Sequence, residues 1–254
     1  MKFRLFVLLL LTSFFSQAQF EPQVFTDSKG THLNYQILYP KNYDASQKYP
    51  LVLFLHGAGE RGDDNMAQLK NGAKEVFEKL ENSHPCIVIA PQCPKESYWG
   101  SVKFSRDKYP LVFDFNYNYP EKEPLHAAVE LVKTFIKDKK ADKHQIYITG
   151  LSMGGMGTYE AVARYPKLFA AAMPICGGGD LSAYGKKEAK IPFWIFHGDA
   201  DGVVEVKYSR QMYAHLKELG ANVKYTEYPG VNHNSWDNAF AESEYPGWMF
   251  QFRR

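Results

Sequence analysis

Cysteine is scarce in this sequence, and no residues gather in a metal-binding motif. The 254 residues include three cysteines, at positions 86, 93 and 176, with no CxxC pair and no His/Cys cluster. If the apolar run between Cys86 and Cys93 is a strand, their Cα atoms lie ~23 Å apart, far beyond the ~5–6 Å of a disulfide. Cys176 could pair with either one only if the fold brought them together. We therefore expect no structural disulfide and no metal site.

Excess charge of either sign is also lacking. The whole chain has 30 basic and 28 acidic side chains, and two of the basic ones, Lys2 and Arg4, stand in its first 18 residues. Residues 19–254 therefore carry 28 of each. A net charge of zero argues against nucleic acid or an anionic membrane as partner.

The one long apolar run is at the N-terminus and is too short to span a bilayer. Leu5–Leu11, extended by Phe14 and Phe15, falls short of the ~20 residues of a transmembrane helix. It has a basic start and ends at Ser16-Gln17-Ala18, which resembles a signal-peptidase site. We expect residues 1–18 to be a signal peptide rather than a membrane anchor, and 19–254 to be a single α/β domain. Because no cysteine follows the run directly, a lipoprotein anchor is not expected.

Short apolar runs and helical periods alternate along the rest of the chain, without internal repeats. This pattern is typical of a mostly parallel sheet covered by helices on both faces. The expected strands are Asn34–Tyr39, Leu51–Leu55, Cys86–Ala90, Gln145–Thr149, Ala170–Pro174, Pro192–Phe196 and Val223–Tyr228. The expected helices are 66–80, Leu125–Ile136, Met153–Tyr165, Val206–Leu219 and one that starts at Ser235.

The strongest chemical signal is Gly-Leu-Ser-Met-Gly at 150–154, between an expected strand and an expected helix. A serine in such a turn has a strained backbone that exposes its hydroxyl, and the flanking glycines avoid clashes. The following helix directs N–H groups and its positive end toward developing negative charge. A dinucleotide-binding loop would need Gly or Ala at position 160, where Glu stands. The motif predicts Ser152 as a nucleophile.

A serine nucleophile needs a base and an acid that orients this base. Of eight histidines, His233 lies in a loop after the last expected strand, which matches the chain order Ser, acid, His. His56 and His197 each end a strand before a glycine, a position typical of a structural role. The turn that starts at His197 offers Asp199 and Asp201 as the acid.

An oxyanion hole would complete the site, with two backbone N–H donors. The first should come from Met153, directly after the nucleophile. The second should come from the glycine-rich loop 56–62, where Ala58 is in the expected position.

The segments LFLHGAGERGDDN, APQCP, GLSMGGMGTY, PICGGGD, HGDADGVV and NHNSWDNAF together resemble the α/β-hydrolase superfamily. More narrowly, they resemble secreted bacterial esterases related to carbohydrate esterase family one and prolyl-oligopeptidase-like "predicted peptidases". The resemblance implies an α/β-hydrolase fold without a large cap. Its HGxxDxxV pattern assigns the acid to Asp201 and leaves Asp199 as a turn cap.

The resemblance implies a serine esterase that needs no cofactor and forms an acyl-enzyme on Ser152. Acetyl or feruloyl esters of plant polysaccharides are the implied substrates, and no protein partner is implied. A serine peptidase of the prolyl-oligopeptidase type is one alternative, weakened by the lack of a propeller domain. A non-catalytic carbohydrate-binding protein is the other.

Lys95–Pro120 fits neither secondary-structure period and holds eight aromatic residues. A loop this long is usually functional or disordered, and so many aromatics argue against disorder. Because it follows a strand of the expected parallel sheet, we expect it in the pocket wall, with Trp99 as a substrate contact. The alternative is that its rings pack the loop onto the body.

Overall fold

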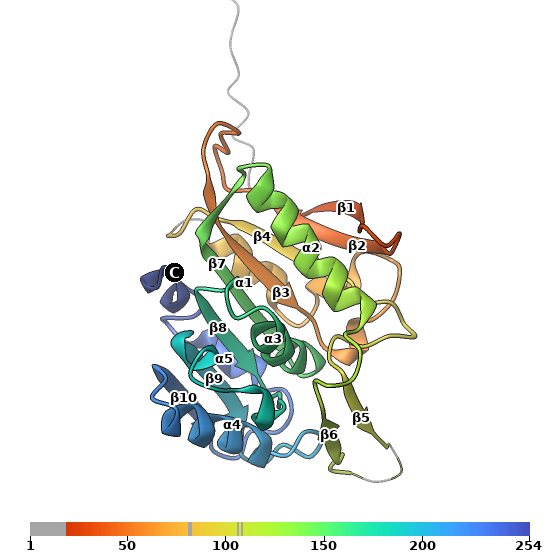
Figure 1. The fold of residues 1–254 in the computed structure, drawn as a ribbon, viewed down its shortest axis with the longest axis vertical. Coiled ribbons are helices and arrows are strands. Elements are labelled where there is room, and N and C mark those ends of the chain that lie inside the picture. Colours follow the sequence, from red (N-terminus) through yellow and green to blue (C-terminus); the bar gives the residue numbers. More distant parts are fainter. Residues whose placement is uncertain (1–18, 81–82, 106, 108) are drawn as a thin grey trace, which may run out of the picture.

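The computed structural model describes residues 19–254 except 81–82, 106 and 108, so the expected signal peptide lies outside the described residues. Its centre is an eight-stranded sheet in the order β1-β2-β4-β3-β7-β8-β9-β10 (Figure 1). The strands β1 and β2 are antiparallel to their neighbours in the sheet. The other six strands, in the sheet order β4-β3-β7-β8-β9-β10, run parallel to one another. The mostly parallel α/β sheet is confirmed. The strands are β1 (Glu21–Thr26), β2 (His32–Leu38), β3 (Tyr49–Leu55), β4 (Ile87–Pro91), β7 (Ala141–Leu151), β8 (Ala171–Ile175), β9 (Phe193–Gly198) and β10 (Val223–Tyr228).

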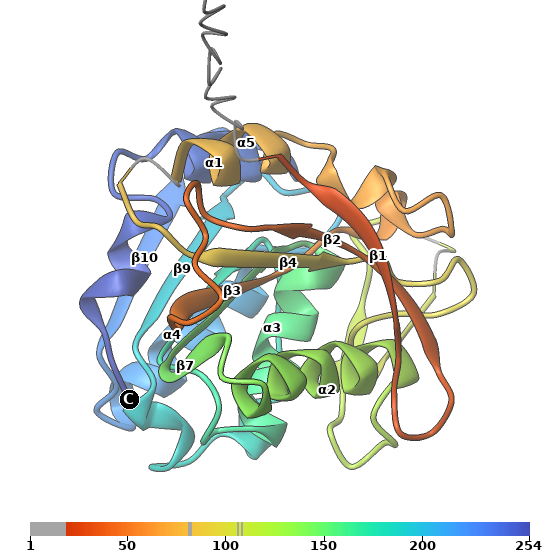
Figure 2. The same ribbon diagram turned by 90° about the horizontal axis from the view of Figure 1, so that it is seen from above.

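Helices cover both faces of this sheet (Figure 2). On one face lie α2 (Glu123–Lys137), α3 (Met153–Arg164) and α4 (Lys207–Glu218). On the other lie α1 (Ala73–Leu80) and α5 (Trp236–Ala241). Alternate residues of β3 enter the two cores: Leu53 packs with the α2 and α3 face, and Phe54 with the α1 face. This two-sided burial explains the unbroken apolar runs of the central strands.

Two elements differ from the sequence expectation for local reasons. The helix expected over 66–80 is a short 3₁₀ turn at Ala67–Leu69 followed by α1, because Asn71 and Gly72 adopt φ values of 58° and 80°. Such left-handed residues end a helix. The strand β1 was not expected, because its residues are mostly exposed and carry no apolar run.

Residues 95–120, which we call the hairpin arm, contain a two-stranded antiparallel ribbon of β5 (Val102–Phe104) and β6 (Phe113–Phe115). The ribbon extends away from the main sheet (Figure 1). It is attached to the segment before and within α4: Leu111 N–H donates to the Val203 carbonyl (3.0 Å) and Phe113 N–H donates to the Tyr208 hydroxyl (3.0 Å). The arm is therefore fixed against the loop that contains Asp201.

Over the residues that the structure describes, no helix is long and apolar enough to cross a bilayer. Cys86, Cys93 and Cys176 are buried, and they form no disulfide bond with one another.

Candidate active site

Ser152 occupies a strained turn between β7 and α3. Its φ of 54° and ψ of −116° lie in a region that side chains other than glycine rarely adopt. The turn is held by the Ser152 N–H, which donates to the Ile175 carbonyl of β8 (2.9 Å). A Cβ added to Gly154 would lie 1.9 Å from the Leu55 carbonyl oxygen, so a larger residue would displace the backbone. Residues 150–154 thus form the expected exposed-serine turn.

The structure brings Ser152, His233 and Asp201 into one hydrogen-bonded chain. Ser152 Oγ lies 2.8 Å from His233 Nε2, and His233 Nδ1 lies 2.7 Å from Asp201 Oδ2. Because an ionised carboxylate only accepts hydrogen bonds, Nδ1 carries the proton and Nε2 accepts from the serine hydroxyl. This is the arrangement that a serine–histidine–acid mechanism requires.

The Asp201 carboxylate is buried, and donors surround it. Its Oδ1 accepts from the N–H groups of Val203 (2.8 Å) and Val204 (2.9 Å), while its Oδ2 faces His233 and His197. Burial raises the pKa of Asp201, but hydrogen bonds from His197 and His233 outweigh this effect and hold the pKa well below 3.8. Asp201 therefore stays ionised next to His233.

Asp199 contacts the histidine loop at a different point. Its Oδ1 accepts from the Gly230 N–H at 2.6 Å, so it joins the turn after β9 to the loop after β10. Asn232 makes a second link, since its Oδ1 accepts from Gly202 N–H (2.9 Å) and from His233 N–H (2.7 Å). The two loops that carry the acid and the base are thus held together by capping side chains.

Ala58 and Met153 stand at the starts of two helical turns beside Ser152. Ala58 opens a 3₁₀ turn directly after β3 and lines the same cavity as Ser152, while Met153 is the first residue of α3. In the part of the chain that the structure describes, neither backbone N–H has a hydrogen-bond acceptor. Both donors are therefore available to a bound group.

A cavity of about 330 Å³ lies over Ser152 and His233 and matches the lower end of ligand-site volumes. The hairpin arm and the turn that follows Asp201, at Val203 and Val204, supply most of its apolar wall. A larger hollow of about 590 Å³ between α1 and the C-terminal segment contains none of these residues, so size alone does not locate the site. The wall residues with apolar side chains are Ala58, Tyr98, Leu111, Phe113, Leu151, Met156, Val203, Val204 and Trp236.

The structure corrects the expectation that Trp99 contacts the substrate. Its side chain is completely buried, and its Nε1–H donates to the His56 carbonyl at 3.1 Å. Its ring also packs edge-on against the His56 ring, with centroids 5.3 Å apart. Trp99 therefore packs the arm onto the body, while the adjacent Tyr98 lines the cavity. The expectation that the arm forms part of the cavity wall agrees with the positions of Tyr98 and Phe113.

The sequence analysis did not predict that two polar residues, Glu60 and His197, lie at the site. Glu60 borders the cavity, and burial raises the pKa of its carboxyl group despite opposing hydrogen bonds from Asn71 and from the Gly57 N–H. His197 contacts Asp201 through Nε2 at 3.1 Å. The position of His197 four residues before the acid is a signal that could have suggested this contact.

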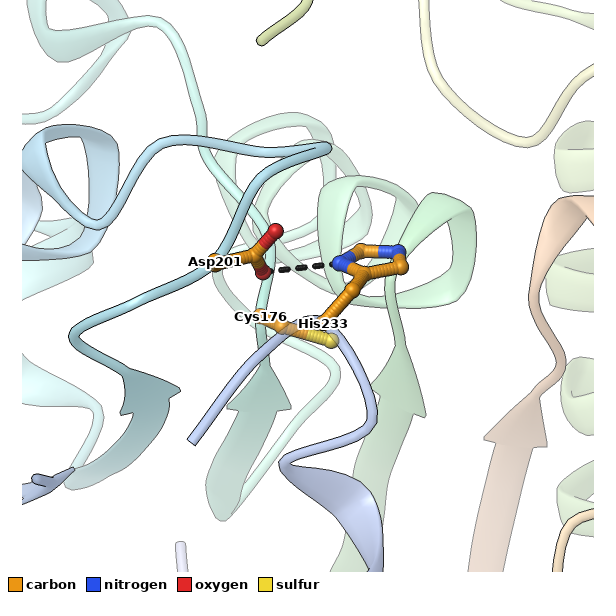
Figure 3. A group of neighbouring side chains, drawn as sticks. All are labelled: Cys176, Asp201 and His233. Atoms are coloured by element: carbon orange, nitrogen blue, oxygen red, sulfur yellow. Dashed lines mark hydrogen bonds and ion pairs between the residues drawn. The ribbon is translucent and has the colours of Figure 1, made fainter. Parts of the chain in front are cut away.

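Cys176, Asp201 and His233 bring three possible metal ligands within 4.8 Å of one another (Figure 3). Metal coordination would require a thiolate. Burial raises the pKa of Cys176 well above 9.0, and the charge of Asp201 raises it further, so the thiol keeps its proton. The other two donor atoms are already bonded to each other at 2.7 Å. The chemistry of these three donors does not fit a resident metal.

The mostly parallel sheet, the strained serine turn and the Ser–His–Asp chain define a serine hydrolase with the α/β-hydrolase fold. The chain belongs to the phospholipase/carboxylesterase family, whose family model matches residues 42–244. A probable carboxylesterase of Oryza sativa subsp. japonica is 28% identical over 201 residues, which cover 76% of this chain and 85% of the rice protein.

Solved structures of esterases share the fold. A thermostable esterase is 39% identical with a TM-score of 0.82, and the match covers 93% of this chain but 64% of that protein. A ferulic acid esterase has a TM-score of 0.66 at 17% identity, covering 90% of this chain and 97% of that chain, a likeness of fold alone. Together with the family, these comparisons identify the chain as a carboxylic ester hydrolase.

Proposed function

We propose that the protein is an exported serine esterase that forms an acyl-enzyme on Ser152 and acts on feruloyl or acetyl esters of plant polysaccharides. The observation that carries the proposal is the continuous chain from Ser152 through His233 to Asp201 at the floor of a cavity with aromatic walls. Export rests on the basic start and short apolar run of residues 1–18. Residues 19–254 would then act as one domain.

In the acylation step, Ser152 Oγ attacks the ester carbonyl carbon while His233 Nε2 takes the hydroxyl proton. The tetrahedral intermediate collapses when the carbon–oxygen bond to the alcohol breaks, and His233 returns the proton to the leaving alcohol. Water then attacks the acyl-enzyme, His233 takes a proton from it, and the acid is released with Ser152 regenerated. Asp201 keeps the imidazole in the required tautomer and stabilises its charged form.

The developing oxyanion needs donors at a fixed position. The backbone N–H groups of Met153 and Ala58 are the proposed pair, because neither has an acceptor among the described residues. Ala58 lines the cavity beside Ser152, and Met153 directly follows Ser152 at the start of α3. The N-terminus of α3 adds its positive end to the same place. Each such donor typically contributes about 3 kcal/mol to the transition state.

The cavity walls favour feruloyl over acetyl groups. Tyr98 and Phe113 present rings, and Leu111 and Val204 present flat aliphatic surface, to a space that suits one phenolic acyl group. The sugar released from the ester would leave through the open side of the cavity.

A panel of four substrates tests the proposal: a feruloylated arabino-oligosaccharide, an acetylated xylo-oligosaccharide, 4-nitrophenyl acetate and a prolyl peptide amide. We expect the highest kcat/KM on the feruloyl ester and no turnover of the amide. Higher kcat/KM on the amide would favour the peptidase alternative. Binding of the oligosaccharides without hydrolysis of any ester would indicate the carbohydrate-binding alternative.

The cavity wall predicts different effects for two aromatic substitutions in the arm. Phe113→Ala should raise KM for the feruloyl ester roughly 2- to 10-fold, because one aromatic contact is lost. It should leave KM for 4-nitrophenyl acetate unchanged. Trp99→Ala removes a packing side chain and should lower the free energy of unfolding by about 3–5 kcal/mol. Steady-state kinetics and thermal melts measure both. A selective feruloyl defect in Trp99→Ala would reverse the assignment.

The pH dependence should show a single ionisation on the acidic side. A general base takes up a proton only in its unprotonated form, so kcat/KM should fall as the pH decreases. Because the pKa of Asp201 lies below 3.8, that carboxylate stays charged through this fall and adds no second step. A plot of log kcat/KM against pH should have a limiting slope of one, and EDTA should leave the rate unchanged. A slope of two, or loss of activity with EDTA, would contradict the mechanism.

A further inference from the structure

His197 at the end of β9 is a second histidine bonded to the acid. Its imidazole is completely buried. Its Nε2 lies 3.1 Å from Asp201 Oδ2 and 2.8 Å from the Val204 carbonyl oxygen, and its Nδ1 lies 2.7 Å from Ser209 Oγ in the first turn of α4. All three contacts are within hydrogen-bond distance.

The neighbours of His197 determine which nitrogen carries a proton. Nε2 faces a carboxylate and a carbonyl, which are both acceptors, so Nε2 must be the donor. The Ser209 hydroxyl can donate to Nδ1 or to the Gly177 carbonyl, and the former contact is shorter, 2.7 Å against 3.2 Å. Whichever of the two accepts the hydroxyl proton, the Nε2 proton points to Asp201 and to the Val204 carbonyl.

We propose that His197 is a positioning residue for the ester hydrolysis proposed above. It extends the triad to a five-residue chain, Ser152–His233–Asp201–His197–Ser209, with contacts of 2.8, 2.7, 3.1 and 2.7 Å. Two imidazole N–H groups approach the same Oδ2 of Asp201, one from the end of β9 and the other from the loop after β10. The second donor fixes the carboxylate so that its lone pair stays directed at His233 Nδ1.

The same imidazole holds the turn that forms part of the cavity wall. The Val204 carbonyl accepts from His197, while the Val203 carbonyl accepts from Leu111 of the hairpin arm (3.0 Å). Val203, Val204 and Leu111 all line the cavity. Removing the Nε2–H leaves a buried carbonyl and a buried carboxylate each short of one donor, a costly state in the protein interior.

Substitutions that differ in one property separate positioning from packing. His197→Phe keeps a ring and removes the donor. His197→Gln places an amide donor close to the position of Nε2, and His197→Asn carries the same amide on a shorter side chain. Tyr147→Phe is the control for loss of a partly buried hydrogen bond away from the site, since the Tyr147 hydroxyl donates to the Phe252 carbonyl at 2.8 Å.

The variants are assayed with a 4-nitrophenyl ester for kcat and KM, with a fluorophosphonate for labelling of Ser152, and by thermal melting. We expect His197→Phe to lower kcat on the order of 10- to 100-fold and to keep KM within about twofold. This is the effect of removing hydrogen-bond partners that orient metal-binding side chains in other enzymes. His197→Gln should restore most of kcat and His197→Asn should not. Tyr147→Phe should lower the melting temperature and keep kcat.

Wild-type kcat in a folded His197→Phe variant would overturn the proposal. If His197→Phe fails to fold, equal kcat in the Gln and Asn variants would overturn it, and a higher kcat in Gln would support it. A low-field proton resonance of the His233–Asp201 hydrogen bond that shifts in His197→Asn and returns in His197→Gln would show the coupling directly. Wild-type protein that neither hydrolyses esters nor reacts at Ser152 would instead refute the proposed function.

Discussion

Ser152→Ala should leave a folded protein that hydrolyses esters slower by on the order of 10⁴-fold or more. Alanine keeps the Cβ and has the same backbone restriction as serine, so the turn at φ 54° is no more strained than before. Only the nucleophile and its hydrogen bond to His233 are lost. The rate that remains would come from the backbone donors and from substrate binding.

A fluorophosphonate provides the direct measurement. It should label wild-type protein at one residue, Ser152, identified by peptide mass spectrometry, and should not label Ser152→Ala. Ser182→Ala is the matched control: its hydroxyl donates to Asp180 (2.6 Å) away from the cavity, and this variant should keep both labelling and turnover. Labelling at another serine, or full activity of Ser152→Ala, would refute the nucleophile assignment.

The central strands could be predicted because burial on both faces leaves a signal in the sequence. Leu51–Leu55 and Pro192–Phe196 are apolar without interruption, and the structure places β3 and β9 over these ranges. The edge strand β1 leaves no such signal, because an exposed strand needs no apolar residues. The start of α1 depended on the left-handed backbone at Asn71, which the helical period through that region does not reveal.

The site was predictable where a local turn fixes a side chain and unpredictable where tertiary packing does. Ser152 is fixed by the strand-to-helix turn itself. In the arm, Tyr98 lines the cavity while the adjacent Trp99 is completely buried, and no property of the two residue types distinguishes these fates. His197 looked structural because it ends a strand before a glycine, and its contact with Asp201 depends on how the turn folds back.

Asp201→Asn should lower kcat on the order of 10⁴-fold without unfolding the protein. The reason lies in the donors around the carboxylate. Oδ1 accepts from the N–H groups of Val203 and Val204, and Oδ2 accepts from His233 and His197. Both carboxylate oxygens therefore face only hydrogen-bond donors. The NH₂ group of an asparagine must face either the two backbone N–H groups or the two imidazoles.

The backbone N–H groups of Val203 and Val204 cannot change, whereas an imidazole can move its proton. The NH₂ group therefore takes the Oδ2 position and faces His233, which must present a lone pair at Nδ1 and carry its proton on Nε2. In that tautomer His233 donates toward Ser152 and cannot accept the hydroxyl proton. The expected loss is in kcat, with KM little changed, because the cavity wall is intact.

Asp199→Asn is the matched control, since it makes the same chemical change two residues away in the same turn. Its Oδ1 accepts from the Gly230 N–H, and the asparagine oxygen can still do so. This variant should keep kcat within about twofold and lose at most ~1 kcal/mol of stability, the scale of one hydrogen bond. Kinetics with a 4-nitrophenyl ester and urea unfolding of both variants measure the contrast. If Asp199→Asn abolished turnover while Asp201→Asn only lowered stability, the acid would be Asp199, and the tautomer argument would have to be rebuilt on the loop after β10.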